Sequence, residues 1–234
     1  MTKLNTQLFY ASDETYEANR THSEDLDRKL GVAVEAIELG LLEIAKSKLP
    51  DGDHKNWGQA IHEGNQTWVG LSHQTLQTPY GELREICELL TPQDSSTVVD
   101  LGAGYGRLGL VLGSFFPEVN FIGHEYVPER VTEGQRVLEL YKCQKAKLLQ
   151  KNLTSPDYEL PLAEYYFIYD YGTVPHLRRT LKQLEVIAEK KNFKVIARGK
   201  GVRSLIQYEF PWLSQVYEAI HREQYSIYSM SQNL

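Results

Sequence analysis

The sequence has few cysteines and no long apolar run. Only two cysteines, Cys87 and Cys143, occur among 234 residues, and neither stands at a spacing typical of metal ligands. So low a cysteine content excludes a disulfide scaffold and indicates a reducing compartment. No run approaches the roughly 18 apolar residues of a membrane span, and the polar N-terminus lacks the apolar core of a signal peptide. We therefore expect a soluble, cytoplasmic protein with no membrane association and no bound metal.

Basic residues are scarce in the first part of the chain. The formal net charge is −6, and residues 1–53 contain eleven acidic and six basic side chains. Nearly all of the net charge therefore lies in this segment, and the remainder of the chain is close to neutral. The acidic balance argues against general binding of nucleic acid. An acidic segment beside an active site would instead attract a basic protein substrate.

The chain begins with a segment that we interpret as a helical extension. Apolar residues between positions 24 and 49 recur at steps of three and four, which predicts one helix that Pro50 ends. Residues 51–77 lack this period and contain Trp57 and Trp68, which either cover a pocket as a lid or pack as a hydrophobic clasp. The N-terminal helix is also a candidate contact for a homodimer.

After a helix expected over residues 80–90, strands and helices alternate. This alternation predicts a doubly wound α/β fold, in which helices cover both faces of a parallel sheet. The strands expected are residues 97–101, 119–124, 145–150, 165–170 and 193–198, and the helices between them are residues 106–115, 128–141 and 175–190. Two further strands, residues 213–219 and 225–230, are expected near the end of the chain.

A glycine-rich loop follows the first of these strands. Its sequence is VVDLGAGYG, residues 98–106, with Gly102, Ala103, Gly104 and Gly106 in the turn. Glycine allows positive φ and close approach of a ligand, and N–H groups at the start of a helix bind anionic groups. Dinucleotide enzymes usually show G-x-G-x-x-G, whereas the order here is G-x-G-x-G. Asp100 would repel a pyrophosphate but suits an ammonium group, which favours S-adenosylmethionine over a nicotinamide dinucleotide.

The second strand of the expected sheet ends in a carboxylate. Glu125, followed by Tyr126, stands 25 residues after Asp100. From this position a carboxylate can accept hydrogen bonds from both hydroxyl groups of a ribose. Dinucleotide enzymes use the same position, and a glutamate at a strand end is by itself also compatible with an exposed acid. In combination with the glycine loop, Glu125 indicates a nucleoside-binding site, with Tyr126 beside it.

Two more strand ends carry candidate binding residues. Asn152 and Leu153 follow the third strand, where the amide would bond the edge of an adenine and the leucine would pack on its face. Asparagine is also a common turn residue. Asp170 and Tyr171 follow the fourth strand. Because strand ends in such sheets line the ligand crevice, we expect these two beside the sulfonium, with an exposed turn as the alternative.

Together, the sequence VVDLGAGYG, Glu125 and the pair Asp170-Tyr171 resemble a class I S-adenosylmethionine-dependent methyltransferase. The two closing strands fit the antiparallel seventh strand of that family. The resemblance covers roughly residues 78–230. It implies a mostly parallel seven-stranded sheet with an antiparallel last strand. The chain would then comprise an acidic helical extension or lid over residues 1–77 and a cofactor-binding domain over residues 78–234.

Within this family, the chain looks most like the seven-strand histone-lysine methyltransferases outside the SET class. In that branch a Tyr-Gly-Glu segment stands ahead of the glycine loop, as Tyr80-Gly81-Glu82 does here. The resemblance implies that Tyr80 and Glu82 flank the methionyl end of the cofactor. We expect Asp170 to orient or deprotonate an amine, while Tyr171 and Tyr80 shape the channel, since tyrosine faces suit an ammonium group.

The sequence therefore predicts S-adenosylmethionine-dependent methyl transfer to the lysine amine of a protein. A small-molecule acceptor is the alternative, because the histone enzymes carry an Asn-rich aromatic motif where this chain has Asp170-Tyr171-Gly172. A non-catalytic protein that binds S-adenosylmethionine is the third interpretation. The sequence has no D/N-P-P-Y/F motif, which disfavours methylation of adenine or of a glutamine amide.

Overall fold

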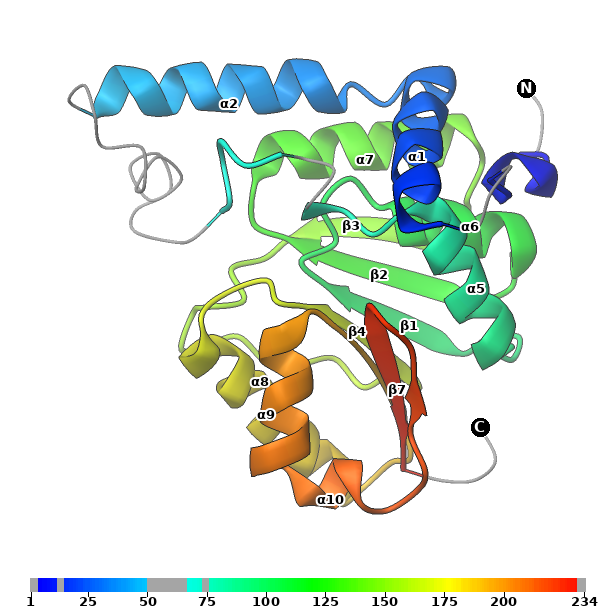
Figure 1. Ribbon diagram of the computed structural model, residues 1–234, viewed down its shortest axis with the longest axis vertical. Coiled ribbons are helices and arrows are strands. Elements are labelled where there is room, and N and C mark those ends of the chain that lie inside the picture. Colours follow the sequence, from blue (N-terminus) through cyan, green and yellow to red (C-terminus); the bar gives the residue numbers. More distant parts are fainter. Residues whose placement is uncertain (1–3, 12–14, 50–66, 73–75, 231–234) are drawn as a thin grey trace.

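The computed structural model describes residues 4–11, 15–49, 67–72 and 76–230, and every structural statement below refers to these ranges. Seven strands form one sheet in the order β3-β2-β1-β4-β5-β7-β6 (Figure 1). The strands are β1 (Thr97–Leu101), β2 (Asn120–Glu125), β3 (Ala146–Gln150), β4 (Tyr165–Tyr169), β5 (Lys194–Arg198), β6 (Ile220–His221) and β7 (Tyr225–Ser229). Neighbours among β1 to β5 pair in parallel, and β7 is antiparallel to both of its neighbours. The predicted α/β fold class is confirmed.

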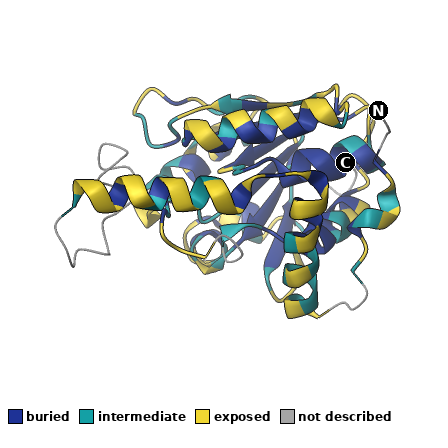
Figure 2. Ribbon diagram, turned by 90° about the horizontal axis from the view of Figure 1, so that it is seen from above, coloured by how far each residue is buried: buried dark blue, intermediate teal, exposed yellow. Residues whose placement is uncertain are grey.

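Helices cover both faces of the sheet because its central strands bury both of their sides. In β1, Val98 belongs to one hydrophobic cluster and Val99 to the other, as the alternation of side chains along a strand requires. The first face packs against α5 (Tyr80–Leu90), α6 (Arg107–Phe115) and α7 (Pro128–Leu140), and the second against α8 (Val174–Ala188), α9 (Lys200–Glu209) and α10 (Pro211–Ser214). Figure 2 shows the strands as the buried interior, with exposed residues on the outer sides of the surrounding helices.

The N-terminal part forms two long helices, which corrects the single helix expected over residues 24–49. A short 3-10 helix, η1 (Thr6–Phe9), precedes α1 (Tyr16–Leu30) and α2 (Val34–Lys48). The chain turns at Gly31, whose φ of 69° lies in the left-handed region that glycine adopts readily. Residues on both sides of the turn, Leu30 and Val34, are buried in the same cluster. The apolar period therefore continues from α1 into α2, and for this reason the period alone does not indicate the turn at Gly31.

The N-terminal helices share the hydrophobic cluster on the first face of the sheet. The rings of Phe9 and Tyr80 lie 5.5 Å apart between centroids, and Leu26 and Leu30 of α1 are buried nearby. In Figure 1, α1 stands beside α5, and α2 runs along α7. The extension is therefore packed into the body of the protein.

The expected division into residues 1–77 and 78–234 stays a prediction. The shared hydrophobic cluster contains residues from both of these segments. Trp57, one of the two tryptophans of the irregular segment, lies outside the described residues. Within the described ranges, every helix is too short or too polar to cross a membrane.

The chain after β5 differs from the expectation. Residues 200–209 form α9, in which Val202, Leu205 and Ile206 are buried at helical spacing, although we expected no element there. The strand expected over residues 213–219 is wrong, because the helix α10 occupies its start and β6 is only two residues long. Three apolar positions in a short, otherwise polar segment give too weak a period to distinguish a helix from a loop.

A buried ion pair joins α1 to the body of the protein. The Arg107 guanidinium of α6 donates hydrogen bonds to both carboxylate oxygens of Asp27, and each side chain is only 6% exposed. The Tyr80 hydroxyl donates to Asp27 Oδ1 at 2.9 Å, and Arg107 Nη1 donates to the carbonyl oxygen of Thr78 at 3.2 Å. A buried charge is costly unless it is paired and hydrogen-bonded, so this cluster holds α1 in one position.

We expect Asp27→Ala to lower the free energy of unfolding by about 3–5 kcal/mol, because it leaves the buried Arg107 charge without a partner. The matched control is Asp25→Ala, which removes an exposed ion pair with Arg28 on the same helix. This control costs less than about 1 kcal/mol. Urea denaturation followed by circular dichroism measures both variants, and equal losses would contradict the role given to the buried pair.

Candidate functional site

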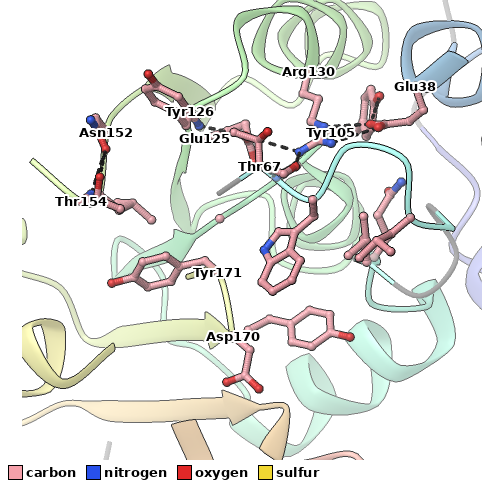
Figure 3. Close-up of a pocket in the computed structure, with 18 residues that line it drawn as sticks. Glu38, Thr67, Tyr105, Glu125, Tyr126, Arg130, Asn152, Thr154, Asp170 and Tyr171 are labelled. Carbon is pink, nitrogen blue, oxygen red and sulfur yellow. Dashed lines mark hydrogen bonds and ion pairs between the residues drawn. The ribbon is translucent and has the colours of Figure 1, made fainter. Parts of the chain in front are cut away.

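A cavity of about 320 Å³ lies at the carboxyl edge of the parallel strands (Figure 3). The predicted site residues that line it follow four different strands: Gly102 and Gly104 after β1, Glu125 and Tyr126 at β2, Asn152 and Leu153 after β3, and Asp170 and Tyr171 after β4. Carboxyl ends of neighbouring parallel strands meet at one edge, which explains this convergence. The volume is in the range of small-molecule sites. Within the described ranges, no three His, Cys, Asp or Glu side chains converge as metal ligands.

The glycine loop leaves part of its backbone open toward the cavity. Gly102 and Gly104 have φ values of 89° and 54°, both in the left-handed region. A Cβ atom at Gly102 would lie 2.8 Å from the Cβ atom of Tyr171, whereas no described atom lies within 4 Å of such a position at Gly104. Close packing therefore requires glycine at position 102, and position 104 leaves room for a ligand.

Ala103 and Gly106 do not line the main cavity. Gly106 stands at the N-cap of α6 with a φ of 75°, and a Cβ atom there would lie 3.0 Å from the side chain of Leu148. Ala103 lines an adjoining recess of about 40 Å³, which shares Gly102 and Gly104 with the cavity. These two predicted residues therefore shape the loop and its recess.

Asp100 lines the same recess and is 7% exposed. Burial, and then the nearby charge of Glu125, raise the pKa of the Asp100 carboxyl to about 8. The carboxyl is therefore mostly protonated at neutral pH when no cation is bound beside it. A bound ammonium group would favour the ionised form, so the position suits the ligand group that the sequence predicts for it.

Backbone amides hold the Glu125 carboxylate in one orientation. Its Oε1 atom accepts the N–H groups of Tyr126 and Val127 at 2.8 and 2.9 Å, and Oε2 accepts the N–H group of Gly104 at 3.0 Å. These bonds tie the end of β2 to the glycine loop. A carboxylate has about four acceptor sites, so Oε2 retains capacity for a ligand hydroxyl group.

Asn152 fits both of its interpretations. Its Oδ1 atom accepts hydrogen bonds from the backbone N–H and the hydroxyl of Thr154, at 2.9 and 2.7 Å, so the residue forms a turn after β3. Asn152 also lines the cavity, together with Leu153. The turn therefore fixes where this pair stands, and the contact of either residue with adenine stays a prediction.

Asp170 lines the cavity, but its carboxylate already has two partners. Its oxygens accept the N–H groups of Gly201 and Val202 at 2.9 and 2.8 Å, which satisfies the start of α9. In Figure 3 this carboxylate points away from the cavity. The geometry thus gives Asp170 a structural task and offers no support for the expected proton transfer from an amine. Tyr171 lines the cavity with its hydroxyl bound to Thr180 Oγ1 at 2.5 Å.

Tyr80 and Glu82 do not line the cavity, and their expected place beside the methionyl end of the cofactor stays a prediction that this geometry does not support. Tyr80 is fully buried, and burial raises the pKa of its hydroxyl well above the usual value. Glu82 is paired with Arg198 at 2.5 Å, and burial raises the pKa of its carboxyl. A local Tyr-Gly-Glu motif does not reveal which distant side chains its members will meet. Here those partners are Asp27 and Arg198.

Sequence reasoning missed several lining residues from the N-terminal part and the helices. Glu38 of α2 lines the cavity, as do Thr67 and Leu71, and so does Trp68, for which the sequence suggested either a lid over a pocket or a hydrophobic clasp. Trp68 therefore stands on the cavity wall, with a φ of 59° that is uncommon for a residue other than glycine. Arg130, five residues after Glu125 at the start of α7, also lines the cavity. The sequence signal that could have identified Arg130 is its position in the first turn of α7, directly after the strand end that carries Glu125.

Comparisons with known proteins gave structural matches only. No family model matches the chain, and no curated protein matches it. An RNA methyltransferase from Salinibacter ruber, in complex with S-adenosyl-L-homocysteine, is 15% identical and covers 68% of this chain and 95% of its own, with a TM-score of 0.49. A precorrin-6Y C5,15-methyltransferase from Geobacter metallireducens is 16% identical, covering 68% and 92%, with a TM-score of 0.49. The C-terminal domain of the Rhodobacter capsulatus enzyme of that name is 15% identical, covering 70% and 95%, with a TM-score of 0.48.

We expect Asp100→Asn to stabilise the ligand-free protein at pH about 8 and to have little effect at pH about 4. In the folded protein the Asp100 carboxyl keeps its proton up to pH about 8. In the unfolded chain it loses that proton near pH about 4. The folded state thus binds the extra proton, so wild-type stability falls across this window as the pH rises, whereas asparagine does not titrate.

Differential scanning calorimetry across this pH range measures the difference in Tm between wild type and Asp100→Asn. The control is Asp94→Asn, at an exposed position just before β1. If the difference in Tm were the same at every pH for both variants, the raised pKa would be contradicted.

Proposed function

We propose that the protein is an S-adenosylmethionine-dependent methyltransferase. The observation that carries this proposal is that the binding residues predicted from the sequence at the ends of four strands line one cavity. Their chemistry is complementary to the parts of this cofactor. Two carboxyl groups suit an ammonium and a pair of ribose hydroxyls, an open glycine backbone suits the methionyl group, and an amide with an apolar neighbour suits adenine.

The order of the strands supports a particular orientation of the cofactor in the cavity. Asn152 and Leu153, after β3, would hold the adenine, and Glu125, at β2, would accept the ribose hydroxyls. The glycine loop after β1 and the recess with Asp100 would hold the methionyl group. The methyl group would then stand toward β4, where Tyr171 lines the cavity. This sequence of contacts follows the sheet order β3-β2-β1-β4 without a gap.

The protein's own task in this reaction is alignment and exclusion of water, because the bound cofactor supplies a methyl group that is already activated. Trp68, Tyr169 and Tyr171 line the cavity and would exclude water from it. The Arg198 guanidinium lies 4.2 Å from the centroid of the Tyr169 ring, which holds that ring in place. Asp170 fixes the start of α9 and thereby positions the strand end that carries Tyr171.

For the acceptor we propose an amine, either the side chain of a protein lysine or a small molecule. Aromatic side chains of the cavity wall, among them Trp68, Tyr169 and Tyr171, favour an amine, since aromatic faces attract ammonium groups and methylated nitrogen. The Tyr80-Gly81-Glu82 segment, which favoured the histone-lysine branch, does not line the cavity, and Asp170 has other partners. Lysine therefore has no advantage over a small amine in this geometry.

We expect wild-type protein to bind S-adenosylmethionine and Glu125→Gln to bind it about 10- to 100-fold more weakly, because the variant loses charge-assisted hydrogen bonds to the ribose. Isothermal titration calorimetry measures both affinities. Glu129→Gln is the matched control, since Glu129 is exposed four residues away in the first turn of α7. A folded wild-type protein that does not bind the cofactor would overturn the proposed function.

Methyl transfer itself is tested with tritium-labelled S-adenosylmethionine in a cell lysate that is then separated by size. We expect label in an amine, either as methyl-lysine in the protein fraction or as a methylated amine among small molecules. Either fraction would assign the source of the acceptor. If the cofactor binds but neither fraction gains label above a Glu125→Gln control, the protein is a non-catalytic binder.

A further inference from the structure

Helix α2 of the N-terminal part reaches the cavity through one acidic side chain. Glu38 lines the cavity and is 11% exposed in its side chain (Figure 3). Its Oε1 atom accepts hydrogen bonds from Arg130 Nε at 2.8 Å and from the Tyr105 hydroxyl at 2.7 Å. Its Oε2 atom accepts a bond from Arg130 Nη2 at 3.0 Å. Glu38 therefore binds the glycine loop and α7 at once.

The Arg130 guanidinium has its donors directed at the N-terminal part. Two of them go to Glu38, and Nη1 donates to the carbonyl oxygen of Thr67 at 3.1 Å. Arg130 is slightly more buried than Glu38, with 9% of its side chain exposed. The Glu38 contact is bidentate, which is the strongest geometry for an arginine and a carboxylate.

Glu125 is the next acid that Arg130 can reach. Arg130 Nη1 lies 3.9 Å from Glu125 Oε1, close enough for electrostatic attraction but beyond hydrogen-bonding distance. The Glu125 side chain is 8% exposed. Without the Glu38 charge, the buried guanidinium would have Glu125 as its closest remaining acid, and attraction between buried charges is strong.

We infer that Glu38 is a positioning residue for the cofactor: by holding Arg130, it keeps the Glu125 carboxylate available for the ribose hydroxyl groups. The N-terminal helix α2 then contributes to the free energy of cofactor binding through Glu38. This inference rests on the proposed function. Because linkage is reciprocal, a cofactor that gains affinity from the Glu38 contact must stabilise that contact by the same factor.

The test compares S-adenosylmethionine binding by wild type, Glu38→Gln and Glu35→Gln in calorimetric titrations. We expect Glu38→Gln to bind about tenfold more weakly, a size typical of coupled sites. Glu35→Gln removes the same charge at an exposed position of α2 and should bind as wild type does. The rise in Tm caused by saturating cofactor should also be smaller in Glu38→Gln, a difference that a purely structural residue would not produce.

A weaker affinity of Glu38→Gln has two explanations: the freed Arg130 guanidinium competes for Glu125, or the substitution disturbs the site in another way. The double variant Glu38→Gln/Arg130→Gln distinguishes them. If the freed guanidinium competes for Glu125, removing it restores part of the affinity lost in Glu38→Gln. Should Glu38→Gln fail to fold, hydrogen exchange of the wild type gives the answer, since cofactor must then slow exchange in α2 more than in η1.

Three results would overturn the inference. They are equal affinities of Glu38→Gln and Glu35→Gln, a double variant that binds no better than Glu38→Gln, and unchanged exchange in α2 on addition of cofactor. In each of these the wild type still binds, so the proposed function stands. A wild type that does not bind S-adenosylmethionine would overturn the proposed function and, with it, this role of Glu38.

Discussion

Arg107 occupies the first position of α6, directly after the glycine loop, and its guanidinium is buried there. A cation at the start of a helix is unfavourable, since the backbone dipoles already place positive charge at that end. Asp27 compensates this charge from the N-terminal part, in a water-poor site where the ion pair is strong. The glycine loop and α1 therefore depend on the same pair of charges. An N-terminal part packed elsewhere would leave Arg107 unpaired beside the cavity.

The same relation recurs twice along the chain. Arg130 pairs with Glu38 and Arg198 pairs with Glu82, and in each case the acid precedes the sheet while the arginine belongs to its body. The acidic N-terminal segment thus has an internal use, because two of its carboxylates neutralise buried arginines next to the cavity. Its remaining acids include exposed ones, such as Asp25, which could still attract a basic substrate. Net charge by itself did not distinguish these two uses.

Much of the sheet and of its binding edge could be predicted from the sequence, because the determinants are local. Each central strand is a short apolar run ended by polar or glycine residues, and parallel topology brings those ends to one edge. Gly102 and Gly104 of the glycine loop, Glu125 and Tyr171 were predicted on that basis, and they line one cavity. Where the determinants were weaker, the prediction failed: α9 has only three buried apolar residues, and the break at Gly31 lies inside a continuous apolar period.

The partners of buried charges could not be predicted in this way, because pairing depends on the folded structure and not on spacing along the chain. Tyr80 and Glu82 match a family motif, yet their contacts are with Asp27 and Arg198, more than fifty residues away in sequence. Burial makes such pairing obligatory, since an unpaired charge in this interior would cost more than most single contacts contribute. Glu38 gave no sequence signal for the same reason. The charged residues that determine the electrostatics of this site are thus the ones that are hardest to predict from the sequence, because their partners are distant along the chain.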